Sequence, residues 1–270
     1  MSTNAASEPV ITFEGVRIGF DAGEVLHGVS MQVASRETKI LVGETGSGKT
    51  LLLKLAAGLH RPDAGRIVVL GQEISAMSET ELLDFRRQVG FVFQEGALFD
   101  SMSVEENVAY RLREEGVDEA EIEQKVHEAL CFVELEDAID KFPGELSGGM
   151  RRRVSIARAL ISAPSIVLYD SPTAGLDPVT AQTIITLILR LRDTQGVTAL
   201  LATHRLQDAF AMVHYRFDAE SGRVVPLAQN GAKSNPTTSF VVLREGAIYF
   251  EGEYKAINDS ADAYVKKFLL

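Results

Sequence analysis

The feature that most constrains this chain is a glycine-rich segment between a short apolar run, residues 39–42, and a helical pattern over residues 51–59. The segment reads Gly43, Glu44, Thr45, Gly46, Ser47, Gly48, Lys49 and Thr50. A buried strand followed by a glycine loop and a helix is the order that a phosphate-binding loop requires. Small residues let backbone N–H groups surround the phosphates, and the helix N-terminus adds positive potential. We therefore expect Lys49 to reach the β- and γ-phosphates of a nucleotide and Thr50 to offer its hydroxyl to Mg²⁺.

The composition is that of an acidic globular protein. Of the 270 residues, 46% are hydrophobic and 24% are charged, and the formal net charge is -11. The chain has no excess of Lys and Arg to neutralise the phosphates of DNA or RNA, so we expect no nucleic-acid partner. Its single cysteine, Cys131, excludes an internal disulfide. No apolar run reaches the ~18–20 residues that cross a bilayer, and residues 1–10 lack a signal-peptide pattern, so we expect a cytoplasmic protein.

The order of strand and helix patterns predicts a single α/β domain over residues 8–270. Residues 10–33 alternate apolar and polar side chains around a turn, which predicts a pair of antiparallel strands. Residues 95–162 predict an inserted helical subdomain. Further on, strands alternate with helices, so the main sheet should be mostly parallel. The polar segment 218–238 predicts a surface loop or hairpin. The expected fold class is a P-loop NTPase core with an N-terminal antiparallel β subdomain and an inserted α-helical subdomain.

A second motif narrows the class of protein. Residues 146–150 read Leu-Ser-Gly-Gly-Met and open a helix with Ser147 at its cap and Gly148 and Gly149 in its first turn. Alone, this pattern is only a well-capped helix that carries two glycines at a modest cost in stability. The full set of motifs, in chain order, is the phosphate loop, Gln94, residues 146–150, Asp170, Asp177 and His204. That set resembles the ATPases of the ATP-binding cassette (ABC) family over nearly the whole chain.

The resemblance implies that the chain binds ATP and Mg²⁺, and it gives each matching residue a role. Asp170 would bind Mg²⁺ through water, Gln94 would reach the metal and respond to the partner, and His204 would contact the γ-phosphate. Phe20 would stack on adenine, with Phe13 as a weaker rival. The expected metal-site residues are Thr50, Gln94 and Asp170. The residues expected to act in hydrolysis are Lys49, Gln94, Asp170, Ser171 and His204.

The same resemblance implies a homodimer. In the family, the residues that match Ser147, Gly148 and Gly149 contact the γ-phosphate bound by the other subunit, and the one that matches Asp177 lies at the seam between subunits. A chain with one phosphate loop and one such motif needs a second copy to complete two equivalent sites. The segment 94–102 is where integral membrane permease subunits are expected to dock, which would hold the chain on the cytoplasmic face of the inner membrane.

Ser171 departs from the family pattern, because the family has a glutamate there that acts as the general base. Losing a general base costs on the order of 10²–10⁴-fold in rate. Lys49, Mg²⁺ and the helix that starts at Ser147 would still supply positioning and charge. Three interpretations stay open: slow hydrolysis with His204 and Gln94 orienting water, ATP-dependent dimerisation without appreciable hydrolysis, or an introduced substitution that traps the ATP state. Slow hydrolysis is the working hypothesis.

Within the family, the chain is most similar to the ATPases that power phospholipid transport with permeases of the Mla type and Mce-domain proteins. The segments that carry this similarity are 93–104, 106–113, 250–252 and 263–269. It implies a lipid substrate that contacts the permease rather than this chain. The alternative function is an ATP-dependent clamp or regulatory module with little or no hydrolysis, which Ser171 motivates. We interpret the arginines at 151–153 as a solvated helix face without a ligand.

Overall fold

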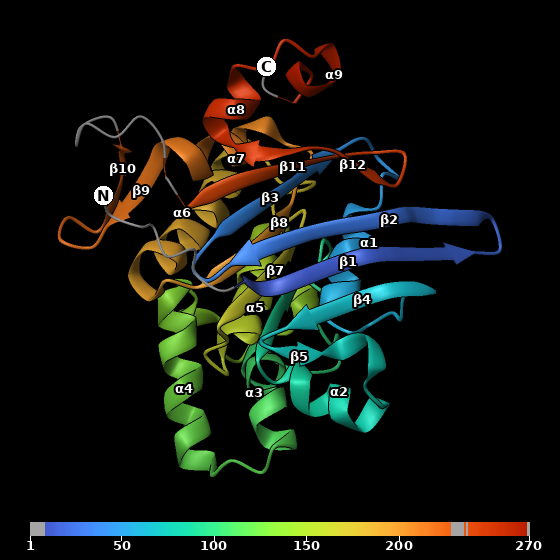
Figure 1. Ribbon diagram of the computed structural model, residues 1–270. Coiled ribbons are helices and arrows are strands. Elements are labelled where there is room, and N and C mark those ends of the chain that lie inside the picture. The colour runs from blue at the N-terminus through green and yellow to red at the C-terminus, as the bar shows by residue number, and fades with distance from the viewer. Residues whose placement is uncertain (1–8, 228–234, 236, 269–270) are drawn as a thin grey trace, which may run out of the picture.

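The computed structural model describes residues 9–227, 235 and 237–268, and in this part of the chain the strands form three sheets (Figure 1). The largest sheet has the strand order β12-β11-β3-β8-β7-β6. Its strands are β3 (Thr38–Gly43), β6 (Val89–Val92), β7 (Ile166–Asp170), β8 (Thr198–Ala202), β11 (Thr238–Arg244) and β12 (Ala247–Glu253). All neighbours are parallel except β12, which pairs antiparallel with β11. The mostly parallel sheet predicted from the sequence is therefore confirmed.

Strand β3 lies in the middle of this sheet, and its side chains alternate between two hydrophobic cores. Ile40 and Val42 join one buried cluster, and Leu41 joins the other. Every residue of β3 is buried, which fits a parallel strand covered on both faces. Helix α1 (Lys49–Ala56) packs in the core that contains Leu41, through leucines that each contribute about 1.5–3 kcal/mol when fully buried.

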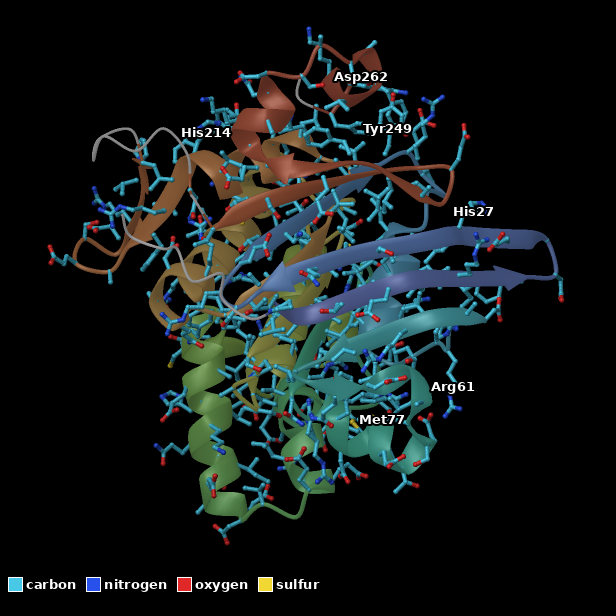
Figure 2. The ribbon with its side chains drawn as sticks, in the orientation of Figure 1. His27, Arg61, Met77, His214, Tyr249 and Asp262 are labelled. Atoms are coloured by element: carbon cyan, nitrogen blue, oxygen red, sulfur yellow. The ribbon has the colours of Figure 1, made fainter. Side chains whose placement is uncertain are left out.

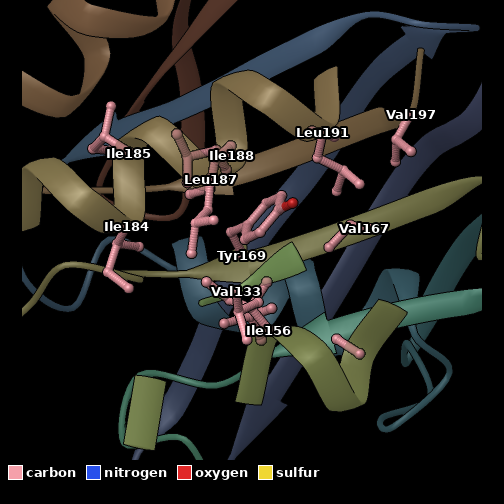
Figure 3. Packing of buried hydrophobic residues seen from close by; sticks show 14 of the residues in the cluster. Val133, Ile156, Val167, Tyr169, Ile184, Ile185, Leu187, Ile188, Leu191 and Val197 are labelled. Atoms are coloured by element: carbon pink, nitrogen blue, oxygen red, sulfur yellow. The ribbon is translucent and has the colours of Figure 1, made fainter. Parts of the chain in front are cut away.

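The opposite core lies under helix α6 (Pro178–Gln195), as Figure 3 shows around Tyr169. Ile184 and Ile188 of α6 and Ile156 of helix α5 (Gly148–Leu160) surround the strand that carries Tyr169. Tyr169 is fully buried, and burial raises the pKa of its hydroxyl. This packing fixes the carboxyl end of β7, where Asp170 emerges.

The N-terminal sheet has the order β2-β1-β4-β5 and confirms the antiparallel pair predicted for residues 10–33. Its strands are β1 (Pro9–Phe20), β2 (Gly23–Ala34), β4 (Ala64–Val69) and β5 (Gln72–Glu73). Phe20 pairs with Gly23 at the turn, so Phe20 lies at the far end of the ribbon. A short 3₁₀ helix (Ile74–Ala76) and helix α2 (Glu79–Arg86) follow this sheet.

Helices α3 (Val104–Glu114), α4 (Glu119–Phe132) and α5 occupy the segment in which a helical subdomain was expected. Two 3₁₀ helices, Glu136–Ala138 and Pro143–Glu145, connect α4 to α5. Asn107 is fully buried, and its Nδ2 donates to the carbonyls of Phe99, Met102 and Ser103 at 2.9–3.0 Å. These bonds hold the segment that precedes α3 in one conformation.

The C-terminal third contains helix α7 (Leu206–His214), the hairpin of β9 (Tyr215–Asp218) and β10 (Arg223–Pro226), and helices α8 (Tyr254–Asn258) and α9 (Ala263–Lys266). Strand β10 lies within the predicted loop or hairpin 218–238, of which residues 228–234 and 236 lie outside the described residues. Arg192 and Asp193 anchor the hairpin: Arg192 Nη2 donates to the Tyr215 carbonyl at 2.8 Å, and the Phe217 amide donates to Asp193 at 2.7 Å.

The segment of α9 returns to the phosphate loop. The Tyr249 hydroxyl donates to Asp262 at 2.8 Å, and Figure 2 shows these two side chains near each other at the C-terminal end. Lys267 then pairs with Glu44 at 2.6 Å. Across the described residues, none of the helices combines the length and the apolar character that spanning a bilayer requires.

Candidate functional site

The phosphate loop connects β3 to α1 and can be built only with glycine at two of its positions. A Cβ on Gly43 would lie 2.5 Å from the Leu243 carbonyl oxygen. Gly48 caps helix α1 with a φ of 100°, and a Cβ there would lie 2.5 Å from Leu26 Cδ2. Left-handed backbone and close approach are both conditions that favour glycine. The loop is thus shaped by the strands around it.

Lys49 is held over the carbonyl groups of its own loop. Its Nζ donates to the carbonyls of Gly43 and Glu44, each at 2.8 Å, and lies 3.4 Å from Ser47 Oγ. Burial lowers the pKa of Lys49, and the charge of Asp170 partly offsets this effect. The ammonium group is therefore placed at the loop, where the phosphates of a nucleotide would lie.

Thr50 and Asp170 form a pair of oxygen ligands at the first turn of α1. Thr50 Oγ1 donates to Asp170 Oδ1 at 2.9 Å. Burial raises the pKa of Asp170, against the lowering effect of this bond and of the nearby Lys49 and Lys54. A buried carboxylate beside a hydroxyl is a donor set that suits Mg²⁺, which prefers oxygen ligands and takes the remainder from phosphates and water. The two residues therefore fit the metal predicted from the sequence.

A cavity of about 480 Å³ opens beside the loop and brings most of the predicted residues together. Its lining consists of Phe20, Val25, Thr45, Gly46, Gly48, Lys49, Thr50, Leu51, Lys54, His60, Gln94, Ser171 and His204. Phe20 is 52% exposed, whereas its rival Phe13 is 1% exposed in the core, so only Phe20 is accessible to a base. The cavity thus extends from an aromatic ring, past the loop, to Gln94 and His204.

Ser171 lies at the end of this cavity with Gln94 and His204. It has a left-handed backbone, with a φ of 45°, and its amide donates to the Ala202 carbonyl at 2.9 Å. Among the described residues, no carboxylate side chain lines the cavity. Gln94 and His204 therefore share with Ser171 a cavity whose described lining has no carboxylate.

Asp208 is a buried carboxylate that contacts the loops after β7 and β8. It accepts hydrogen bonds from Thr173 and from Thr203, the latter at 3.1 Å, and it lies 3.7 Å from Arg205. Burial raises its pKa. These bonds tie the loop after β7 to the loop after β8, so Asp208 holds in place the two loops that carry Ser171 and His204.

The start of α5 and the start of α6 lie outside the cavity but next to each other. Asp177 caps α6, and its Oδ2 accepts from Thr180 Oγ1 at 2.5 Å. A Cβ on Gly149 would lie 2.2 Å from Thr180 Cγ2, so glycine is required where the two helices meet. Ser147 caps α5 by accepting from the Met150 amide at 3.2 Å, and Gly148 has open surroundings. This exposed pair of helix starts suits contact with another molecule.

A second cavity, of about 630 Å³, lies beside the segment 94–102. It is lined by aromatic side chains from three segments, including Phe93, Phe99 and Tyr110, together with Arg158. Phe99 and Tyr110 are 41% and 37% exposed, and their ring centroids are 4.8 Å apart. This cavity, which charged side chains from α2, α3 and α5 also line, adjoins the segment that the sequence assigned to partner docking.

The interpretation of residues 151–153 as a solvated helix face is wrong for Arg152, which is buried, whereas Arg151 is exposed and Arg153 is half-buried. Arg151 donates to the Leu146 carbonyl at 2.7 Å, and Arg153 donates to the carbonyls of Val133 and Glu134 at 3.0 and 2.9 Å. Arg152 is only 5% exposed and donates to the carbonyl of Phe93. A run of three cations resembles a solvent-facing pattern, but each guanidinium here also donates to a backbone carbonyl.

Three further residues of the site were missed from the sequence: Lys54, His60 and Arg152. Lys54 lies one helical turn after Thr50 on α1, so the spacing i, i+4 could have placed it near Asp170. His60 lines the cavity, with its ring centroid 5.8 Å from that of Phe20, and the sequence has no signal for this contact. Arg152 lies close enough to Asp170 to act on its charge.

The chain matches the ABC transporter family over residues 26–174. It is 37% identical over 228 residues to the methionine import ATP-binding protein MetN of Rhizobium johnstonii, covering 84% of this chain and 63% of that protein. It is 36% identical to the MetN of Corynebacterium diphtheriae over 219 residues, covering 80% and 64%. The chain thus spans less than two thirds of the length of these relatives.

Solved structures with the same fold are also cassettes. The dimeric, post-hydrolysis structure of the ATP-binding cassette MJ0796 with ADP and Pi is 26% identical, with a TM-score of 0.75, and covers 90% of this chain and 98% of that one. The structure of cbiO1 from Clostridium perfringens, part of the ABC transporter complex cbiONQ, has the same identity and TM-score and covers 97% and 94%. The fold class predicted from the sequence is confirmed.

Proposed function

Because this chain belongs to the ABC transporter family, we propose that it is an ATP-binding subunit that dimerises on ATP, hydrolyses it and thereby drives a membrane permease. The observation that carries this proposal is the Thr50–Asp170 pair beside Lys49 at the mouth of one cavity. A cation for phosphates and an oxygen pair for a metal are the two elements that phosphoryl transfer requires. The ADP and Pi bound by MJ0796 are consistent with this activity.

In this proposal each residue of the cavity has a positioning or electrostatic task. Phe20 offers its exposed ring to adenine, the backbone amides of the phosphate loop bind the phosphates, and Lys49 pairs with their charge. Bound Mg²⁺ neutralises the charge that develops on the phosphate oxygens. Thr50 and Asp170 would hold that ion, and Gln94 lies in the same cavity to reach it.

The attacking water would be oriented by Gln94 and His204, because Ser171 has no carboxylate to take its proton. An imidazole nitrogen and an amide oxygen can each accept a hydrogen bond from water. The Ser171 hydroxyl and the Gln94 amide are poor proton acceptors at pH 7, so the expected hydrolysis is slow. The clamp with little or no turnover is the second candidate, and the absence of a carboxylate from the described lining of the cavity favours it.

The proposed partners are a second copy of this chain and a permease. Ser147, Gly148, Gly149 and Asp177 lie outside the cavity of their own chain, which supports their contact with ATP held by the other copy. The dimeric state of MJ0796 agrees with this. The aromatic hollow at Phe99 and Tyr110 would receive a permease segment at the cytoplasmic face of the membrane.

The proposed cargo is a lipid that contacts the permease. This rests on the resemblance of residues 93–113 to the ATPases of Mla-type systems. The relatives named above import methionine, which makes methionine the competing cargo. Reconstitution of the transporter in vesicles separates the two. Faster phosphate release with a phospholipid-loaded Mce-domain protein supports the lipid, and a response to methionine alone contradicts it.

The experiment that tests the ATPase is steady-state phosphate release at saturating Mg-ATP from the wild type, Lys49→Ala and Ser171→Glu. We expect a wild-type rate above that of Lys49→Ala, and an increase of about 10²-fold or more in Ser171→Glu if position 171 is the site of the base. A wild-type rate no higher than that of Lys49→Ala contradicts turnover. ATP-dependent dimerisation in that case would establish the clamp.

A further inference from the structure

The turn that carries Gln94 is held at both ends by arginines from α5. The turn, residues 93–96, is closed by a hydrogen bond from the Gly96 amide to the Phe93 carbonyl at 3.0 Å. Arg152 donates from Nη1 to the Phe93 carbonyl, and Arg158 donates from Nη2 to the Gly96 carbonyl at 3.0 Å. Gln94 itself is exposed and lines the nucleotide cavity. The position of Gln94 is therefore set by helix α5.

Arg152 also faces the metal end of the site. It is 5% exposed, and burial lowers the pKa of its guanidinium, against the raising effect of Asp170 and Glu95. Its Nε is buried and has no hydrogen-bond partner among the described residues. Burying a cation with one unsatisfied donor is costly unless the charge is used. One guanidinium thus bonds the turn of Gln94 and lies within electrostatic reach of Asp170.

We propose that Arg152 is a positioning residue that fixes Gln94 relative to Asp170, so that Mg²⁺ and ATP bind together. This rests on the proposed function. Arg152 is on the same helix as Ser147, which is expected to meet the nucleotide of the other copy. A shift of α5 when the copies close would therefore move Gln94 of the same chain. Among the described residues, Lys49 bonds to its own loop and Arg152 to the Phe93 carbonyl, so ATP binding without metal should not depend on Arg152.

Substitution of Arg152 should therefore change the metal dependence of ATP binding rather than the binding itself. A hydrogen bond from a charged donor is stronger than one from a neutral donor. In Arg152→Met the Phe93 carbonyl loses this donor, and the turn keeps only its internal bond and the bond from Arg158. We expect the tightening of ATP by Mg²⁺ to fall by about tenfold, which corresponds to ~1.4 kcal/mol. Affinity in EDTA should stay within about twofold of wild type, a change of ~0.4 kcal/mol.

Two further variants separate positioning from general damage. Arg152→Gln loses the charge but keeps an N–H donor for the Phe93 carbonyl, so it should recover most of the tightening. Arg153→Met is the matched control, because Arg153 is on the same helix and donates to the Val133 and Glu134 carbonyls, away from the turn. It should match wild type in both conditions.

The experiment is a titration of the full chain with a fluorescent ATP analogue, in EDTA and in Mg²⁺, with thermal melting of each variant as a fold check. Loss in Arg152→Met with recovery in Arg152→Gln supports the inference. Wild-type metal dependence in Arg152→Met overturns it, as does an Arg152→Gln variant that folds but shows no recovery. If Arg152→Met does not fold, Arg152→Leu, which likewise has no donor, replaces it under the same criteria. A wild type that binds no nucleotide contradicts the proposed function itself.

Discussion

The phosphate loop and the start of helix α5 are both glycine-rich helix N-termini, but they differ in what surrounds them. The loop is enclosed: a Cβ on Gly43 or on Gly48 would meet another atom at 2.5 Å, and Lys49 covers the loop carbonyls. At the start of α5, the nearest atom to a Cβ on Gly148 is Leu176 Cδ2 at 3.6 Å. The phosphate loop is closed by its own chain at Gly43 and Gly48, whereas the start of α5 is closed only at Gly149, by Thr180, and leaves Gly148 free for contact with another molecule.

The largest effect on ATP hydrolysis should come from a substitution in the phosphate loop. Lys49→Ala removes the ammonium group that lies on the phosphate loop, and ATP would then face the loop amides alone. We expect phosphate release to fall by at least about 10³-fold, because charge stabilisation is the main contribution in phosphoryl transfer. Measurement of phosphate release and of binding by the fluorescent analogue checks this. Retention of full activity would contradict the role given to the loop.

The second-largest effect should come from a substitution at the start of α5, which should slow hydrolysis without weakening ATP binding at the phosphate loop. Gly148→Asp places a carboxylate at the first turn of α5, where it suits the helix dipole and meets no atom closely. The variant should fold and bind ATP as a monomer, yet repel the phosphates of a partner copy. We expect about 10²-fold slower hydrolysis and no ATP-dependent dimer, a loss of ~2.8 kcal/mol.

Size-exclusion chromatography with ATP, beside the binding titration, measures both properties. Gly148→Ala is the control for volume, since a methyl group there lies at ordinary contact distance. If Gly148→Asp weakens ATP binding in the monomer as much as Lys49→Ala does, the two regions belong to one site within one chain, and the comparison fails.

A smaller effect tests the far end of the enclosed cavity. Phe20→Ala removes the exposed ring, and stacking of a base on an aromatic side chain is worth about 1–3 kcal/mol. We expect ATP to bind about tenfold more weakly, with triphosphate binding less affected. Phe142→Ala, which removes a ring that is 45% exposed but outside this cavity, should leave the affinity unchanged. Equal effects on ATP and on inorganic triphosphate would contradict adenine stacking.

The smallest effect concerns stability. Burial raises the pKa of Asp170 in the folded protein above its ordinary value of 3.8, which applies to the unfolded chain. At a pH between these two pKa values, the folded state holds a proton that the unfolded state has released. The free energy of unfolding therefore falls as pH rises between the two pKa values. Above both values, the full cost of burying the charged carboxylate remains. In EDTA, Asp170→Asn should melt at a higher temperature than wild type at pH 7, by about 2–4 °C if the gain is ~1 kcal/mol.

The difference in melting temperature should vanish well below pH 3.8, where Asp170 is protonated in both states. Calorimetry over this pH range measures it. A variant that is less stable than wild type at pH 7 would show that the bond from Thr50 outweighs burial. Asp208→Asn serves as the comparison, since Asp208 is buried as well but bonds two loops away from the proposed metal site.

The sequence predicted the parts of this molecule that depend on local pattern. The strand–loop–helix unit at Gly48 and the antiparallel pair at Phe20 follow from spacing and turn residues, and both are present. We also expected four residues to meet at one site, because their order along the chain matches the motifs of the family. They line one cavity: Phe20, Gln94, Ser171 and His204. Their roles in binding and hydrolysis stay predictions.

What the sequence could not predict depends on contacts between distant segments. Arg152 looks like part of a solvated run, and only the packing of α5 on the turn at Phe93 buries it. His60 meets Phe20 because the loop after α1 passes the end of the β1–β2 ribbon. Lys267 reaches Glu44 through a chain of contacts at the C-terminal end. None of these pairs has a periodic or spacing signal.

The place of β3 in the sheet has a consequence for how the protein is made. Its neighbours are β8 and β11, which follow it by well over a hundred residues. On a ribosome that adds about 5–20 residues per second, the phosphate loop leaves the exit tunnel many seconds before the strands that enclose it. The loop must wait exposed until Leu243 pairs with Gly43. Truncated or stalled chains should therefore fail to capture nucleotide, which makes ATP retention a marker of completed synthesis.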